Sequence, residues 1–240
     1  MKPLFFISLI ILFSACKKDK SSVPQLPSYK ITAVTRIGRS INSTYKLSYD
    51  GNGRISQVVC EGPYAYTNTY SYKGDNIYIK GDVPKVENSH KDTITLSSFN
   101  LISTRKVTIQ QSVYHASYNY DGSGKILSLT AQQGNYTFPA INYTISDGDI
   151  TNTISQGITD TSTYYMDKVS VSGNLDDFYQ LINNGSFYFR NKHLKKSLQS
   201  GNNKTDYSYA FDSDGKIISV ISNYNFGAAP DTTNFTYTKQ

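Results

Sequence analysis

The stretch YDGNGRI at residues 49–55 decides how this chain folds, because two more copies follow it, YDGSGKI at 120–126 and FDSDGKI at 211–217. In such a unit the Asp side chain can accept hydrogen bonds from the turn and the Gly can adopt a positive φ angle. The Ile then begins the returning strand, so each copy predicts a β-hairpin. The turn residues are Asp50, Gly53, Asp121, Gly124, Asp212 and Gly215.

The segments between these turns alternate aromatic and polar residues with a period of two. YKLSY at 45–49 and YSYAF at 207–211 are typical, and a period of two places alternate side chains on opposite faces of a sheet. We therefore expect an all-β fold and one domain over residues 29–240. Its form would be a strongly curved antiparallel meander of serial hairpins, an open or partly closed barrel-like sheet. The uneven spacing of the copies excludes a propeller with equal blades.

One segment departs from this period and predicts a short helix over residues 174–183. Asn174 is a suitable N-cap, and Asp176 and Asp177 suit the positive end of the helix dipole. Gly185 can end the helix. Leu175, Phe178 and Ile182 would then lie on one face, packed against the sheet.

Residues 1–15 predict an export signal. Lys2 precedes a run of apolar residues at 4–13, which as a helix would reach about 15 Å, roughly half of a bilayer core. FSAC at 13–16 resembles the bacterial lipobox, in which lipid is added to the Cys and cleavage occurs just before it. The resemblance makes Cys16 the lipidation site and residues 16–28 a flexible tether; a plain signal peptide with a chance Cys is the alternative.

Composition excludes several function classes. The chain of 240 residues has two Cys and three widely separated His, so we expect neither a disulfide framework nor a metal centre. Its net charge of +6 is spread along the chain, which speaks against nucleic-acid binding. No nucleophile-elbow, zinc-protease or phosphate-loop motif occurs. We assign no catalytic residue and no cofactor.

The tyrosine-rich turn units are similar to the YD repeats of Rhs-type proteins. Over most of residues 29–240 the chain resembles lipoproteins of Bacteroidota with a domain of unknown function that is described as porin-like. The resemblance rests on the lipobox followed by KKDK at 17–20, on NLD at 174–176, and on NKHL at 191–194 leading to residues 207–220. It implies a strongly curved antiparallel sheet and brings no known activity.

The biochemical function is unknown from sequence, and three hypotheses follow. The first is a lipid-anchored envelope protein of the outer membrane, a non-catalytic module that binds a glycan or a protein. The second is a structural or assembly factor of the envelope, and the third a polysaccharide-acting hydrolase. The 21 Tyr could form a binding platform or cover the sheet with their hydroxyls in water. We expect a monomer in water rather than a membrane-spanning barrel, on an undetermined side of the membrane.

Overall fold

The computed structural model describes residues 29–38, 42–83, 90–171 and 173–239. The signal peptide at 1–15, the lipidation site Cys16 and the tether at 16–28 lie outside the described residues. The described chain forms sixteen strands and one helix, α1, at Leu175–Asn184. The strands are Tyr29–Ile37 (β1), Asn42–Tyr49 (β2), Ile55–Glu61 (β3), Tyr66–Lys73 (β4), Asn76–Asp82 (β5), His90–Leu96 (β6), Ile102–Ile109 (β7), Ser112–Tyr120 (β8), Ile126–Gln133 (β9), Tyr136–Ser146 (β10), Asp149–Ser155 (β11), Ile158–Val169 (β12), His193–Ser200 (β13), Asn203–Phe211 (β14), Ile217–Tyr224 (β15) and Asp231–Lys239 (β16).

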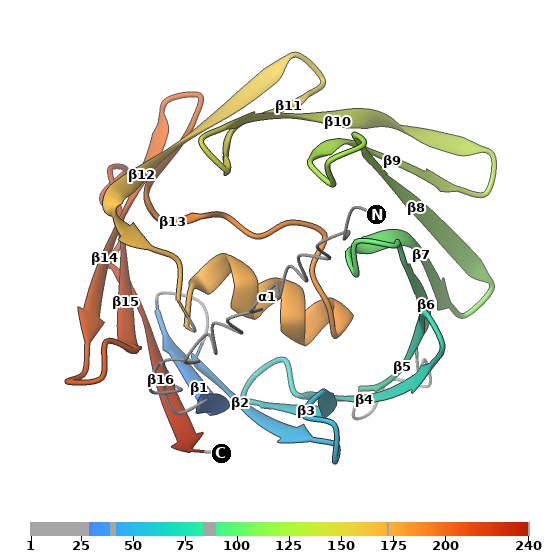
Figure 1. Cartoon of the computed structure of the whole chain (residues 1–240), viewed down its shortest axis with the longest axis horizontal. Coiled ribbons are helices and arrows are strands. Elements are labelled where there is room, and N and C mark those ends of the chain that lie inside the picture. The colour runs from blue at the N-terminus through green and yellow to red at the C-terminus, as the bar shows by residue number, and fades with distance from the viewer. Residues whose placement is uncertain (1–28, 39–41, 84–89, 172, 240) are drawn as a thin grey trace, which may run out of the picture.

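The strands form a closed antiparallel barrel in which each strand pairs with its neighbours in the sequence (Figure 1). The predicted open or partly closed sheet is therefore wrong. β1 pairs with β16 from Tyr29 opposite Lys239 to Ile37 opposite Thr232, with a bulge between Ile31 and Ala33. Closure removes the two edges that an open meander would leave unpaired. No local pattern marks this pairing, because it joins the two ends of the domain.

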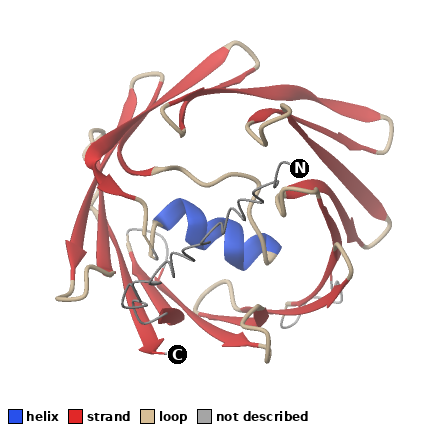
Figure 2. Cartoon of the chain, in the orientation of Figure 1, coloured by secondary structure: helices blue, strands red, loops and turns tan. Residues whose placement is uncertain are grey.

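Helix α1 lies inside the ring of strands (Figure 2). It begins after the N-cap Asn174, whose side chain accepts a hydrogen bond from the Asp176 amide, and it ends at Gly185 with φ 66°. Phe178 and Ile182 join the apolar core that the inward faces of the strands form. The Phe178 ring lies edge-on to Tyr45 and to Phe235, both at 5.7 Å. The helix therefore plugs the barrel instead of covering it from outside.

On several strands buried, mostly apolar or aromatic residues alternate with exposed polar ones, while other strands also expose apolar residues such as Leu127 and Ile218. On β4, Asn68 and Tyr70 are buried while Thr69 and Ser71 are exposed, and on β16 the buried Phe235 lies between Asn234 and Thr236. The outward faces of these two strands are therefore polar. The described helix α1 is not of the length and apolar character needed to cross a membrane.

Many tyrosine rings line the interior, and several of their hydroxyls donate to backbone carbonyls of the wall. Burial raises the pKa of Tyr49 to about 12. A recurring bond runs from a Tyr at the end of one strand to an Ile carbonyl of the preceding strand. The pairs are Tyr49–Ile31 at 2.6 Å, Tyr72–Ile55 at 2.8 Å, Tyr120–Ile102 at 2.7 Å and Tyr237–Ile217 at 2.7 Å. For these four residues the expected wet hydroxyl is wrong: the sheet itself provides the acceptor.

Candidate functional site

The three repeated turns share one end of the barrel, which we call the Asp-turn end. Each follows an even-numbered strand, and in an antiparallel meander such turns lie at the same end. The Asp Oδ1 atom accepts from the amides two and four residues later, and the Gly has φ between 78° and 81°. These residues are Asp50 and Gly53, Asp121 and Gly124, and Asp212 and Gly215. They shape the rim; of the six, only Gly53 lines the pocket described next.

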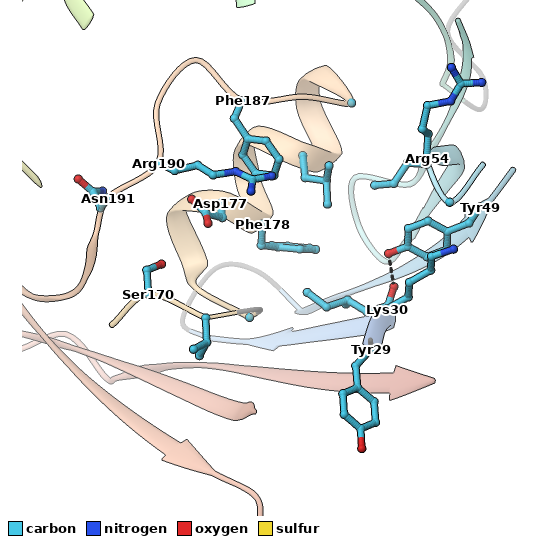
Figure 3. A pocket seen from close by; sticks show the side chains of 17 residues that line it. Tyr29, Lys30, Tyr49, Arg54, Ser170, Asp177, Phe178, Phe187, Arg190 and Asn191 are labelled. Atoms are coloured by element: carbon cyan, nitrogen blue, oxygen red, sulfur yellow. Dashed lines mark hydrogen bonds between the residues drawn. The ribbon is translucent and has the colours of Figure 1, made fainter. Parts of the chain in front are cut away.

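A pocket of about 800 Å³ opens at the Asp-turn end, between α1, the first residues of β1 and the turn that precedes β3 (Figure 3). Its floor is apolar and comes from three elements: Ile31 on β1, Ile55 on β3, and Phe178 and Leu181 on α1. Its rim is polar. The labelled rim side chains are Tyr29, Lys30, Tyr49, Arg54, Ser170, Asp177, Phe187, Arg190 and Asn191.

Local sequence holds the helix at the pocket in one orientation. The Asn174 cap and the Gly185 stop set the length of α1, and Gly185 lies so close to the wall that a Cβ there would sit 3.0 Å from Tyr70. The Tyr70 hydroxyl donates to the Ile182 carbonyl at the end of the helix. Phe178 and Ile182 then face the core, and Asp177 faces the pocket.

Three cations stand at the rim, each on an aromatic ring. The Arg190 guanidinium lies 3.6 Å from the centre of the Phe187 ring, and Lys30 Nζ lies 4.9 Å from that of Tyr49. Arg54 lies 4.1 Å from the centre of the Tyr72 ring and also pairs with Asp50 at 2.7 Å. Within the described ranges, Lys30 and Arg190 make no ion pair. Stacking on a ring holds a cation while leaving its donors available.

Asp177 gives the pocket an acid with an unusual pKa. Its Oδ1 atom is buried and has no hydrogen-bond partner in the described chain. Burial raises the pKa of Asp177 to about 6, the Arg190 charge opposes this, and the Asp176 charge adds to it. A buried carboxylate oxygen without a partner costs free energy, which a ligand with a hydrogen-bond donor can recover.

Asp176 and Asp177 do not form a catalytic pair. Asp176 bonds to Lys195 at 2.6 Å, whereas Asp177 faces the pocket. Glycoside hydrolysis requires two carboxyl groups on either side of one bond, and these two leave the helix in different directions. Within the described residues there is also no group of three or more potential metal ligands.

Sequence reasoning missed one buried ionisable pair. His193 Nδ1 lies 2.6 Å from Asp149 Oδ2, and the His193 amide donates to Asp149 Oδ1 at 2.8 Å. Both side chains are almost fully buried. Because His193 begins β13 and Asp149 begins β11, the pair connects these two strands. The two residues lie 44 positions apart, and nothing in the local sequence joins them. The Arg190–Phe187 stack was missed for a different reason: it lies on an irregular loop with no period.

Comparison with known proteins supports the fold. No family model and no curated protein matches the chain. A porin-like protein from Bacteroides uniformis matches with a TM-score of 0.67 and 14% identity, over 87% of this chain and 96% of that one. A porin-like protein from Bacteroides vulgatus matches with a TM-score of 0.59 and 15% identity, over 87% of this chain and 98% of that one.

The fold is therefore that of the porin-like barrels of Bacteroides, and the predicted resemblance is confirmed at this level. Identity this low shows a shared fold alone. The lipid anchor and the likeness to YD repeats remain predictions from the sequence.

Proposed function

We propose that this protein is a non-catalytic binding module of the bacterial cell envelope, held at the outer membrane by acylated Cys16. Its pocket at the Asp-turn end would bind an amphipathic ligand with an apolar body and one anionic group. This ligand class differs from the glycan or protein that the sequence suggests. The alternative of an assembly factor has no comparable observation in its support. For the hydrolase, the adjacent acids Asp176 and Asp177 of the described helix do not face one another.

The outward faces of three strands support a barrel that stands in water beside the membrane. Thr, Ser, Asn and Lys occupy outward positions on β2, β4 and β16. Burying such a wall in lipid would leave its hydroxyls and charges without hydration, at a cost of several kcal/mol for each charge at the bilayer centre. A lipidated Cys16 would therefore provide the attachment, because several acyl chains give stable anchoring.

The pocket end is the end that the anchor would hold near the membrane. β1 begins at Tyr29, which lines the pocket, and a tether of the length and composition of residues 16–28 spans roughly 20 Å. An envelope ligand with an apolar portion would then meet the pocket at short range.

A single observation carries the proposal: Lys30 and Arg190 stand without an ion pair over an apolar floor. A charge-assisted hydrogen bond from such a cation to an anion contributes about 1.5–3 kcal/mol. The apolar floor adds about 25 cal/mol per Å² of surface that the ligand buries. An anionic head bound by Lys30 or by Arg190, with the apolar body of the ligand on Phe178 and Leu181, would use both a cation and the apolar floor.

A pair of fluorescent dyes tests the proposal. Anilinonaphthalene sulfonate has an apolar ring system and one sulfonate, whereas phenylnaphthylamine has the same rings without charge. With the full chain carrying Cys16→Ser, so that no acyl chain competes, we expect saturable binding of both dyes. The double variant Lys30→Gln with Arg190→Gln should weaken sulfonate binding about tenfold or more. It should leave the neutral dye within about twofold.

Lys106→Gln provides the matched control, because Lys106 is exposed on the outer face of β7. The proposal is wrong if the sulfonate dye shows no saturable binding. It is equally wrong if Lys106→Gln weakens that binding as much as the double variant does.

A further inference from the structure

A second pocket lies at the end of the barrel opposite the Asp turns. It measures about 420 Å³ and is lined by the ends of β7 and β9, the start of β8 and the turn between β7 and β8. Arg105, Tyr114 and Gln133 contribute to its lining, together with Gln110 and Ser112 of the turn. These strands are the part of the ring on the right of Figure 1. No residue of this pocket lines the pocket at the Asp-turn end.

Arg105 is held rigidly by a buried acid. Asp92, 2% exposed, accepts from Arg105 Nε at 3.2 Å and from Nη2 at 2.5 Å through the same oxygen, Oδ2. A guanidinium has five N–H donors, so three of them remain for a ligand. Because a buried carboxylate requires its partner, the Arg105 fork is preorganised and the pair as a whole is neutral.

Aromatic rings stand beside this pair on the same inward face. Tyr114 is opposite Gln133 across β8 and β9, and Gln133 is opposite Tyr136 across β9 and β10. The Phe138 ring lies 5.8 Å from that of Tyr114 and 4.9 Å from that of Tyr136. Tyr136 is 60% exposed, so its ring is available for contact.

We propose that this second pocket binds a neutral saccharide. A sugar ring presents C–H groups that stack on an aromatic face and hydroxyls that pair with planar donors and amides. The fixed Arg105 fork, the amides of Gln110 and Gln133 and the hydroxyl of Ser112 provide these partners. The neutrality of the Asp92–Arg105 pair favours an uncharged sugar over an acidic one, in contrast to the pocket at the Asp-turn end. The site is independent of the proposed function of that pocket.

A glycan array tests this inference with the full chain carrying Cys16→Ser. Neutral oligosaccharides such as maltohexaose and xylohexaose are printed beside uronic-acid oligosaccharides of similar length. We expect retention on one or more neutral glycans. Tyr114→Ala and Tyr136→Ala should each weaken that binding about three- to tenfold, because each removes one stacking surface. Tyr136 is exposed, so its variant is expected to fold normally.

Tyr78→Ala is the matched control, since Tyr78 is 41% exposed on β5, on the opposite side of the strand from the buried Ile77 and Ile79. It should not change saccharide binding, and neither should the double variant of Lys30 and Arg190. That second control separates failure here from failure at the Asp-turn end. The inference is overturned if no neutral saccharide is retained, if the uronic-acid glycans are preferred, or if Tyr78→Ala and Tyr136→Ala have equal effects.

Discussion

The two sides of the barrel wall differ in what their inward faces touch. On the side formed by β1–β6, β15 and β16, which we call the packed wall, inward apolar residues pack with Phe178 and Ile182 of α1. On β7–β12, which we call the open wall, the buried apolar residues are Ile102, Ala116 and Ile126. We therefore expect stability to be concentrated on the packed wall, while the second pocket lies on the open wall.

The largest difference in unfolding free energy is expected between substituting a phenylalanine of α1 and substituting one of the open wall. Phe178 is 2% exposed and contacts rings on β2 and β16. Phe178→Ala should lower the free energy of unfolding by about 3–5 kcal/mol, because it removes a buried ring and leaves a cavity. Phe138→Ala on the open wall should cost less than about 1.5 kcal/mol. Urea unfolding followed by tyrosine fluorescence measures both, and equal losses would contradict the division into two walls.

A smaller effect on the free energy of unfolding is expected at Asp177, on the face of α1 that is turned to the pocket. The pKa of Asp177 is raised from 3.8 to about 6, so between these pH values the folded chain holds a proton that the unfolded chain has released. Its contribution therefore favours folding at low pH and is lost as the pH rises through about 6. At pH 7 the buried Asp177 is charged, and this charge destabilises the folded protein. Asp177→Asn removes the charge, so the gain in unfolding free energy over the parent chain should be about 2–3 kcal/mol larger at pH 7 than at pH 4.

The measurement is the difference in unfolding free energy between Asp177→Asn and the parent chain at each pH. The turn acids Asp50, Asp121 and Asp212 have lowered pKa values, so their contributions are lost as the pH falls. They are common to both chains and cancel in the difference. A difference that does not change with pH would show that Asp177 is not buried in an unpaired state.

The smallest effect should distinguish the repeated turns of the two walls. Gly215, between β14 and β15, has φ 78° and open space around it, so Gly215→Ala should cost about 1 kcal/mol for the backbone alone. Gly124, between β8 and β9, has φ 81°, and a Cβ there would lie 3.1 Å from the Phe99 ring. Gly124→Ala should therefore cost more, by roughly a further 0.5–1 kcal/mol. Thermal unfolding of the two variants side by side measures this difference, and equal losses would show that the Phe99 ring moves away at little cost.

Local features of this fold were predictable because they depend on neighbours in the chain. Asn174 and Gly185 set the start and the end of the helix through their own side-chain and backbone preferences. The alternation around Tyr45 follows from the pleat of a strand. The position of α1 inside the barrel was not predictable, since the apolar face of Phe178 and Ile182 is equally compatible with packing on either side of a sheet. The candidate sites were even harder to predict from the sequence. Arg190, Lys30 and Asp177 come from three separate segments, and Asp92 with Arg105 from two strands.

By itself the sequence determined the repeated hairpin turns, the short helix after Asn174 and the alternation along strands such as 45–49, because each depends on residues within one turn or one strand. Only the tertiary structure decided that β1 meets β16, that the aromatic face is the interior, and that the two ends of the barrel hold pockets of different charge. The physical reason is range. The free energy that closes the ring and fills it comes from contacts between residues up to about two hundred positions apart, and no short segment encodes them.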